Sequence, residues 1–477
     1  MEVRHLNGFR LNDIRLAVER INSSWPDFQN ANLFVTGATG FLGQWLLAVL
    51  LEADREIGLN LRITALTRSP KSFAVKCPDL ASSPALTLAH GDIRSFEFPK
   101  GKFTHLIHAA TDTSAAADSN PLALLDSIVD GTRRVLKFAH MAGIRKVLFT
   151  SSGAIYGPQP SDMGQMAEGY GGACSTTDRR SVYGQGKRLA EQLMTLYHHE
   201  FGIETKIARC FAFAGPAMAM DAHFAIGNFI RDAVGGDSVI VKGDGRPSRS
   251  YMYAADAAAW LIRLLEAGKP GEAYNVGSDQ AYTLSDIAGK VVEEINPQAT
   301  VDILGKENGG FRSQYIPDIT KAKSLGLDVW TVLNKTIART AEWYSVQHKV
   351  TQDRPVTEIG LQEGRGDHVK KHTFVVDIDG VIASLTLNND YSLATPLQHT
   401  IKIVNSLYEQ GNRIILFTAR GSATGIDWSE VTAGQMKDWG VKYHELRFGK
   451  PAADYYIDDR LISIGELEGF ASQLCDG

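Results

Sequence analysis

The chain has 477 residues, a net charge of −5, 44% hydrophobic residues and 22% charged residues. The length predicts two domains or more, and the composition is typical of a globular protein. The negative charge, and the lack of any apolar run near the roughly 20 residues of a membrane span, argue against nucleic-acid and membrane partners.

The cysteines and the N-terminal segment indicate a reducing compartment. The segment MEVRHLNGFRLNDIRLAVERI is charged and amphipathic, unlike a secretion signal. We therefore expect a cytoplasmic protein whose cysteines are free thiols. The cysteines are scattered without metal-ligand spacing, at Cys77, Cys174, Cys210 and Cys475.

The stretch NLFVTGATGFLGQWLLAVLL, residues 32–51, predicts a buried strand, a glycine loop and a helix. Its glycines would let the chain turn sharply, let the backbone approach a diphosphate, and let the helix pack against the strand. The free N–H groups at the start of the helix would then face the phosphates. The cofactor-binding residues expected here are Gly37, Thr39, Gly40, Phe41, Leu42 and Gly43.

The next strands end in residues that could hold the rest of a dinucleotide. The strand LRITALTR ends at Arg68, which could pair with a 2′-phosphate and so favours NADP over NAD; a solvated strand end is the alternative. Asp92 and Ile93 follow a short strand and could hold the adenine edge. Ala109 and Ala110 end another buried strand and would let the cofactor lie against the backbone.

Strands and helices alternate throughout this part of the chain, which predicts a parallel, doubly wound α/β sheet. We expect helices at Asn120–Ala142 and Tyr183–Phe201. Between them, the strand in KVLFTSSGAIYG ends in Thr150, Ser151 and Ser152. Open parallel sheets bind their ligands at this edge.

Tyr183 and Lys187, in SVYGQGKRLAEQL, are four residues apart and lie on one face of a helix. A phenol with a pKa near about 10 is a poor base at neutral pH, but a lysine ammonium and an oxidised nicotinamide would favour its phenolate. Tyr183 could then exchange a proton with a substrate hydroxyl during hydride transfer, while Ser152 hydrogen-bonds the same oxygen. A helix surface pair is the alternative for an isolated Tyr–Lys pair.

Residues 1–344 resemble the extended short-chain dehydrogenase/reductase family, in its NAD-dependent epimerase/dehydratase branch that acts mainly on nucleotide sugars. The resemblance implies a Rossmann sheet with a small substrate-binding subdomain, a homodimer, and Ser152, Tyr183 and Lys187 as the catalytic triad. It also implies that Arg249 reaches the substrate's diphosphate; a surface salt bridge is the alternative. The matching segments are GATGFLG, GDI, HAA, SSGAIYG, YGQGK, ARCFAFAGP, GDGRPSRSYMYAADAA and YNVGS.

One departure from the family's pattern narrows the chemistry. Its 4,6-dehydratases carry an Asp-Glu pair after the serine or threonine and its decarboxylases a Glu, whereas this chain has Gly153 and Ala154. We therefore expect oxidation, ketone reduction or epimerisation through a transient ketone. Epimerisation beside a ketone needs another acid or base, for which His223 is a candidate; packing under the substrate loop is the alternative. Asn228 is a further candidate for substrate binding.

Residues 345–372 are polar and hold Pro355 and several glycines, which predicts a linker. The chain then resumes with a buried strand that ends at Asp377 and Asp379, followed by a glycine. Two carboxylates so placed can hold Mg²⁺ and a phosphate together. Asp377 would attack phosphorus and become an aspartyl-phosphate, while Asp379 would protonate the leaving oxygen and then deprotonate the attacking water.

Further strand ends complete this set. Thr418 in NRIILFTAR could hold the phosphoryl group, Lys450 in FGKP could pair with the aspartate and phosphate, and Asp458 and Asp459 in ADYYIDDR could complete the Mg²⁺ shell. Residues 373–477 thus resemble the haloacid dehalogenase phosphohydrolases, in particular the small phosphatases associated with bacterial capsule synthesis. The short gaps between the motifs leave no room for a separate cap domain.

The sequence therefore predicts a bifunctional enzyme. An NAD(P)-dependent sugar-nucleotide epimerase/reductase would occupy residues 1–344, and a capless, Rossmann-like phosphatase residues 373–477. The expected cofactors are NADP or NAD, and Mg²⁺; the expected substrates are a sugar nucleotide and a phosphorylated small molecule in surface-polysaccharide or related sugar biosynthesis. The alternative is a phosphatase with a non-catalytic, cofactor-binding regulatory module, against which the intact triad argues.

Overall fold

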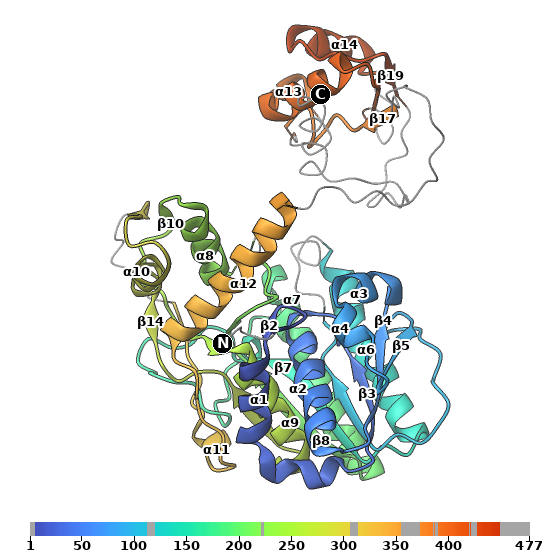
Figure 1. Cartoon of the computed structure of the whole chain (residues 1–477), viewed down its shortest axis with the longest axis vertical. Helices are drawn as coiled ribbons and strands as arrows, with labels where there is room; N and C mark the ends of the chain where they lie inside the picture. The colour runs from blue at the N-terminus through green and yellow to red at the C-terminus, as the bar shows by residue number, and fades with distance from the viewer. Residues whose placement is uncertain are drawn as a thin grey trace. The chain divides into compact units, whose positions relative to one another are not determined.

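The chain forms two compact units, Met1–Thr357 and Glu358–Gly477, and the division falls inside the segment predicted to be a linker (Figure 1). No helix within the described ranges is long and apolar enough to cross a lipid bilayer. The computed structural model describes residues 5–111, 120–220, 224–305, 313–353, 373–384, 386, 390–418, 420 and 427–448.

The first unit is organised around a seven-stranded sheet in which every neighbouring pair of strands is parallel. The strand order reverses between β3 and β6, and ligands bind to such sheets in the crevice at the carboxyl ends of the strands that flank the reversal. The predicted parallel Rossmann sheet is therefore confirmed for this unit. In spatial order the strands are β5 (Leu86–His90), β4 (Arg62–Thr67), β3 (Asn32–Thr36), β6 (His105–His108), β7 (Lys146–Ser152), β8 (Glu204–Cys210) and β13 (Ala273–Val276).

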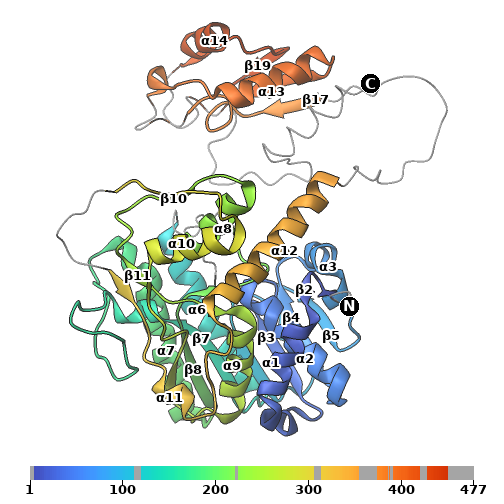
Figure 2. The same cartoon turned by 60° about the vertical axis from the view of Figure 1, so that its left-hand side comes forward.

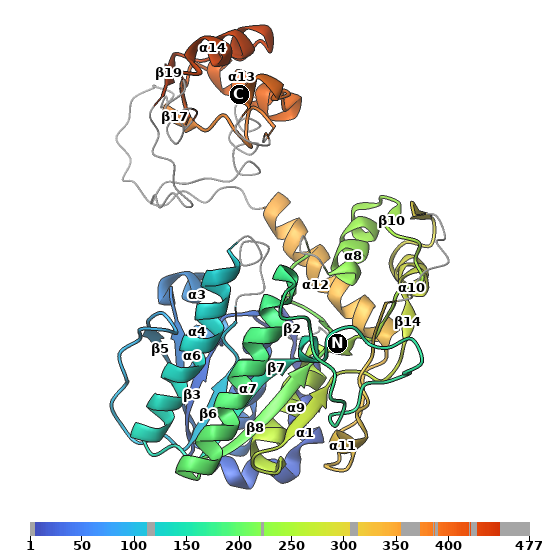
Figure 3. The same ribbon diagram turned by 180° about the vertical axis from the view of Figure 1, so that it is seen from behind.

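Helices cover both faces of this sheet: α1 (Leu11–Arg20), α2 (Phe41–Ile57), α6 (Pro121–Met141), α7 (Val182–Phe201) and α9 (Ala254–Ala267). Helices α1, α2 and α9 lie over one face (Figure 1), and α6 and α7 lie over the other, seen from behind in Figure 3. Alternation along β3 sends Leu33 and Val35 into the core under α2 and α9, and Phe34 into the core under α6 and α7. Burial on both faces explains why these strands are apolar throughout.

The predicted helices begin and end at recognisable signals. The Asn120 side chain caps α6 by accepting a hydrogen bond from the backbone N–H of Ala123 at 3.2 Å, and Pro121 is the first helical residue. Helix α2 ends at Gly58, whose φ of 75° is left-handed, as is common after a helix. The helices predicted at 120–142 and 183–201 match α6 and α7.

A smaller subdomain lies beside the carboxyl edge of the sheet, with its own apolar core between α8, α10 and α12 (Figure 2). Helix α12 buries Leu333, Ile337 and Ala341 in this core and then continues to Asp353, into the predicted linker. Its later turns carry no apolar stripe, which is why the sequence did not predict them as helix. The elements are α8 (Ala225–Gly235), β10 (Val239–Val241), β11 (Ser248–Arg249), β14 (Tyr282–Thr283), α10 (Leu284–Ile295), β15 (Val301–Ile303), β16 (Gln314–Tyr315) and α12 (Leu333–Asp353).

The second unit contains a parallel sheet in the order β17-β18-β19, packed against helices through an apolar core. Val376 on β17 lies beside Leu416 on β18, so Asp377 and Thr418 both come at the carboxyl edge of the sheet. The elements are β17 (Thr373–Val376), α13 (Gln398–Glu409), β18 (Arg413–Phe417), α14 (Ser429–Asp438) and β19 (Glu445–Arg447).

Candidate active site

The glycine loop joins β3 to α2 at the crevice of the first unit, and its geometry requires glycine. Gly37 has a left-handed φ of 73°, and a Cβ there would lie 2.4 Å from the carbonyl group of Ala109. A Cβ on Gly43 would lie 2.1 Å from the carbonyl oxygen of Gly37. Gly40 caps α2 without a side-chain hydrogen bond, so no cap side chain competes for the N–H groups at the start of the helix. This arrangement fits a dinucleotide phosphate.

The other residues predicted for this loop surround the same turn. The carbonyl oxygen of Thr39 accepts a hydrogen bond from Gln44 at 3.1 Å, which fixes the turn before the helix. Phe41 and Leu42 begin α2 and pack partly against the core. The backbone N–H of Ala110 donates to the Thr36 hydroxyl at 3.3 Å, so the end of β6 is tied to the end of β3.

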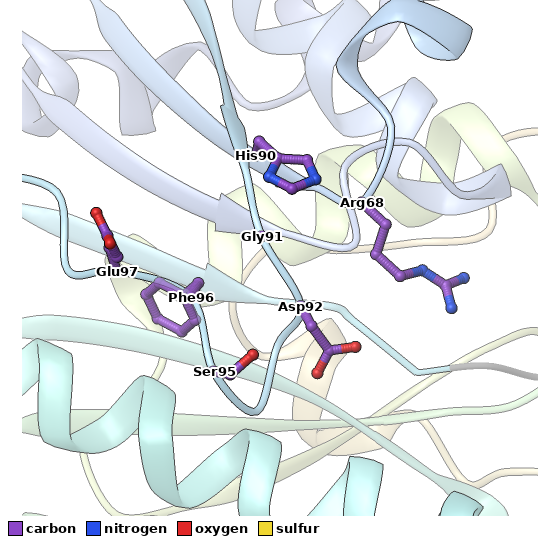
Figure 4. Close-up of a pocket in the computed structure, with 7 residues that line it drawn as sticks. All are labelled: Arg68, His90, Gly91, Asp92, Ser95, Phe96 and Glu97. Carbon is purple, nitrogen blue, oxygen red and sulfur yellow. The ribbon is translucent and has the colours of Figure 1, made fainter.

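A pocket of about 590 Å³ lies at the ends of β4 and β5 (Figure 4), lined by Arg68, His90, Gly91, Asp92, Ser95, Phe96 and Glu97. The Asp92 carboxylate accepts a hydrogen bond from Arg94 Nε at 2.9 Å. This bond, together with the charges of Arg94 and Arg68, lowers the pKa of Asp92. Ile93 instead packs against α6, where a Cβ on Gly131 would lie 3.1 Å from it. Of the two predicted adenine contacts, only Asp92 lines the pocket.

The polar side chains at the carboxyl end of β7 point to opposite faces of the sheet. The Ser151 hydroxyl donates to Glu191 at 2.5 Å, and Glu191 is ion-paired with Arg209, so Ser151 belongs to a structural network. Because successive side chains of a strand point to opposite faces, Ser152 faces the other way. There its Oγ accepts a hydrogen bond from the backbone N–H of Ala154 at 3.1 Å.

Lys187 and Tyr183 project from α7 toward this end of β7. The Lys187 ammonium donates to the Thr111 hydroxyl and to the Thr150 carbonyl oxygen, each at 2.7 Å. It lies 5.8 Å from the centre of the Tyr183 ring. Burial lowers the pKa of Lys187 to about 8, so it remains largely a cation at neutral pH. The contact of Thr111 with Lys187 was not predicted from the sequence, because Thr111 follows HAA as an ordinary loop residue.

The Tyr315 hydroxyl lies beside Gly153, the residue after Ser152, and the Ser152 side chain acts to lower the pKa of both Tyr183 and Tyr315. Burial raises the pKa of Tyr183 to about 12, and its hydrogen-bonding interaction with Ser152 acts in the opposite direction. Burial also raises the pKa of Tyr315 well above its usual value. Cys210, at the end of β8, is neutral because burial raises its pKa to about 12. The structure thus brings together the three predicted triad residues and adds Tyr315, which the sequence analysis did not identify.

Two of the predicted substrate contacts, Arg249 on β11 and Asn228 on α8, lie on the small subdomain. Arg249 donates from Nη1 to the carbonyl oxygens of Ser248 at 2.8 Å and Ser313 at 3.1 Å, and from Nη2 to the Ser313 hydroxyl at 3.3 Å. Its guanidinium has five N–H groups, so these three bonds do not use them all. The Asn228 side chain accepts a hydrogen bond from Arg231 at 3.1 Å. His223 lies outside the described residues.

In the second unit, a buried arginine that the sequence analysis did not single out holds one of the predicted catalytic carboxylates. Arg420 donates from Nη2 to Asp379 Oδ1 at 2.7 Å and from Nε to Oδ2 at 3.1 Å. The Thr418 hydroxyl also points at Asp379, at 3.4 Å. Asp377 accepts a hydrogen bond from the backbone N–H of Ile378 at 2.8 Å. The structure therefore gathers Asp377, Asp379 and Thr418 at one sheet edge.

The remaining predicted residues of this site, Lys450, Asp458 and Asp459, lie outside the described residues. Within the described ranges there is no group of three or more His, Cys, Asp or Glu side chains that could hold a metal ion. Of the predicted Mg²⁺ ligands, Asp377 and Asp379 are described, and both carboxylate oxygens of Asp379 face the Arg420 guanidinium. The described residues therefore supply only part of the predicted metal shell.

A seven-stranded parallel sheet with a glycine loop at its switch point defines the first unit as a Rossmann-type dinucleotide-binding fold. The sequence model of the NAD dependent epimerase/dehydratase family matches residues 33–277. The chain belongs to this family, and its first unit is an NAD-dependent enzyme of the epimerase, dehydratase and decarboxylase kind.

A curated relative supports this assignment, and two solved structures share the fold. UDP-glucuronic acid decarboxylase 3 from Arabidopsis thaliana is 31% identical over 304 residues, which cover 62% of this chain and 83% of that protein. A UDP-N-acetylglucosamine 4-epimerase from Methanobrevibacter ruminantium, in complex with UDP-N-acetylmuramic acid, has a TM-score of 0.58 at 20% identity and covers 66% of this chain and 99% of its own. A UDP-glucuronic acid 4-epimerase variant from Bacillus cereus, solved with a fluorinated UDP-sugar and NAD, has a TM-score of 0.57 at 21% identity, with coverage of 66% and 99%.

Proposed function

We propose that the first unit is an NAD(P)-dependent epimerase or reductase of a UDP-sugar that leaves the carbon skeleton of the sugar intact. The observation that carries this proposal is the position after Ser152. A Cβ on Gly153 would lie 2.6 Å from the Tyr315 hydroxyl. Neither Gly153 nor Ala154 has a side chain that can give or take a proton, where the dehydratases carry an Asp-Glu pair and the decarboxylases a Glu. Hydride and proton exchange at a sugar hydroxyl needs no such acid.

In this mechanism Tyr183 removes the proton from the sugar hydroxyl and later returns it. The Lys187 ammonium, 5.8 Å from the phenol ring, favours the phenolate form. Thr111 and Thr150 hold that ammonium in place. Ser152 donates to the oxygen that becomes a carbonyl. A nicotinamide bound in the crevice would accept the hydride and, in an epimerase, give it back.

Decarboxylation of UDP-glucuronic acid is the second candidate, because relatives of that name are 31% identical over most of their length. It requires the same oxidation to a ketone, after which the neighbouring carboxylate is lost. Gly153 and Ala154 offer no group to assist that loss. Incubation with UDP-glucuronic acid therefore separates the two candidates: a hexuronic acid product supports epimerisation, and a pentose with CO₂ supports decarboxylation.

The dinucleotide is proposed to be NADP or NAD, with Arg68 favouring NADP. The Arg68 guanidinium lines the pocket and could pair with a 2′-phosphate, whereas Asp92 and Glu97 in the same pocket would repel one. Binding constants for NADP⁺ and NAD⁺, measured for wild type and Arg68→Ala, decide between them. Loss of affinity for NADP⁺ alone would support the proposal, and equal losses for both would contradict it.

We further propose that the second unit is a Mg²⁺-dependent phosphatase acting through an aspartyl-phosphate on Asp377. The clustering of Asp377, Asp379 and Thr418 at the carboxyl edge of a parallel sheet supports this proposal. Mg²⁺ held by these carboxylates would neutralise charge on the phosphoryl oxygens. A shared role of both units in surface-polysaccharide or related sugar biosynthesis is part of the same proposal.

The first unit is also proposed to form homodimers through α6 and α7. These helices expose a set of large apolar side chains, and such patches mark interaction surfaces. Sedimentation velocity of the Leu189→Glu variant, compared with wild type, tests the dimer. The exposed side chains are Leu122, Met141, Leu189, Leu196 and Phe201.

Two single substitutions test the two-site proposal as a whole. With Tyr183→Phe, turnover of UDP-sugars should fall by orders of magnitude while hydrolysis of p-nitrophenyl phosphate with Mg²⁺ persists. With Asp377→Asn, the reverse should hold. If wild type with NAD⁺ or NADPH turns over no UDP-sugar, the first unit is instead a regulatory cofactor-binding module. Loss of both activities in either variant would contradict separate sites.

A further inference from the structure

Tyr315 reaches the triad from a part of the chain far from it in sequence. It lies on β16 beside Arg249 on β11, with which it is in register. Its ring packs against Phe211 with centroids 4.6 Å apart. Its hydroxyl occupies the space beside Gly153, at 2.6 Å from where a Cβ would lie. The glycine after Ser152 thus makes room for a second phenol at the proton-transfer site.

The number of hydrogen bonds that Ser152 can make leaves room for one from the Tyr315 hydroxyl. A serine hydroxyl accepts two hydrogen bonds and donates one. The backbone N–H of Ala154 already uses one of its acceptor positions, at 3.1 Å. Tyr315 stays protonated because burial raises its pKa well above the usual value, although the Arg249 charge acts against this. The Tyr315 hydroxyl is therefore a donor, and Ser152 has one acceptor position left.

We propose that Tyr315 is a positioning residue that donates its hydroxyl proton to Ser152 Oγ and so restricts Ser152 to donating. The single Ser152 O–H must then point toward the Tyr183 oxygen or the substrate oxygen. This inference deepens the proposed function and rests on it for the role of Tyr183 as the base.

The orientation of Ser152 decides which form of Tyr183 it stabilises. As a donor it stabilises the Tyr183 phenolate, which is the basic form. Without the Tyr315 hydroxyl, Ser152 regains a free acceptor position and can accept from neutral Tyr183 instead. The other groups facing Tyr183 are Lys187 on its own helix and the neutral thiol of Cys210 on β8. Tyr315 itself also faces Tyr183 and Cys210, and the Tyr315→Phe protein retains both Lys187 and Cys210.

The test is the ionisation of Tyr183 in a Tyr315→Phe variant of the full chain. Tyrosinate absorbance is titrated against pH with NAD⁺ added, and each protein is compared with its Tyr183→Phe counterpart to isolate the Tyr183 signal. We expect the Tyr183 midpoint to rise by about one pH unit, and the acidic limb of the kcat/KM profile for UDP-glucuronic acid to move equally, with about a tenfold loss at neutral pH. An unchanged midpoint in a folded Tyr315→Phe protein would overturn the proposal.

Gly153→Ala provides a second route to the same disturbance, because its Cβ would lie 2.6 Å from the Tyr315 hydroxyl and 2.8 Å from the Phe211 ring on which Tyr315 packs. Its effect and that of Tyr315→Phe should not add in the double variant, whereas additive effects would contradict the shared cause. Tyr170→Phe, in the same apolar cluster, is the matched control and should leave the midpoint unchanged. A shifted midpoint without turnover of any UDP-sugar would support this inference and contradict the proposed function.

Discussion

Lys187 is a buried charged group of the proposed active site, and its burial should make the free energy of unfolding depend on pH in a predictable way. The side chain is 2% exposed, and desolvation lowers its pKa from 10.5 to about 8. The folded protein therefore carries the ammonium at a cost in free energy, which the hydrogen bonds to Thr111 and Thr150 offset in part. Lys187→Met removes the ammonium and fills a similar volume.

The sign of the pH dependence follows from proton binding. Between pH 8 and 10.5 the unfolded chain keeps a proton on Lys187 that the folded protein has released. Stability of the wild type therefore rises with pH in this window. At about 1.4 kcal/mol for each pH unit, the free energy of unfolding gains about 2 kcal/mol between about pH 7 and pH 9.5. The Lys187→Met protein lacks this gain.

Urea unfolding at both pH values, followed by circular dichroism, measures this difference. The free energy of unfolding of wild type minus that of Lys187→Met should increase by about 2 kcal/mol from neutral to alkaline pH. Other titrating groups are common to both proteins and cancel. Lys137→Met, at an exposed position on α6, is the control and should show no such increase. A difference that stays constant or falls with pH would refute the reasoning.

Two further substitutions, one in each unit, test the packing. Gly43→Ala should destabilise the first unit by about 2 kcal/mol, because its Cβ would meet the Gly37 carbonyl oxygen at 2.1 Å. Gly289→Ala, where the added Cβ on α10 would meet no other atom of the described residues, is the control and should be neutral or stabilising. Equal melting temperatures of the two variants would contradict this prediction. Arg420→Met should lower the stability of the second unit by about 3 kcal/mol, because it leaves the Asp379 carboxylate without its buried partner. An Arg420→Met protein with an unchanged unfolding midpoint would show that the ion pair contributes little.

The sequence was sufficient to predict the first unit because its signals are local. Apolar strands and the glycine loop each depend on neighbouring residues, and the structure has β3, α2 and α6 where they were expected. The helical continuation to Asp353 was missed because residues 345–353 carry no apolar stripe and so give no periodic signal. The haloacid dehalogenase assignment stays a prediction, although the parallel order of β17, β18 and β19 agrees with it.

The site was harder to predict because its decisive contacts are not local. Ser152, Tyr183 and Lys187 carry a familiar spacing, but nothing in the sequence near residue 315 connects Tyr315 with Gly153. Their contact depends on how β16 of the small subdomain pairs with β11. The ion pair between Arg420 and Asp379 likewise joins two strand ends that meet only in the folded sheet. Gly153 itself was the available signal, since a missing side chain in a catalytic segment leaves space for another group.

The central claim is that the first unit performs redox chemistry on a UDP-sugar without breaking a carbon–carbon bond. The most direct test is chromatographic separation of the UDP-sugars, followed by mass spectrometry of each peak, after wild type is incubated with UDP-glucuronic acid and NAD⁺; an epimer has the mass of its substrate and is recognised by its separate peak. We expect a sugar product of unchanged carbon number, formed by wild type and not by Tyr183→Phe. Release of CO₂ with a UDP-pentose would contradict it, as would equal conversion by the Tyr183→Phe variant.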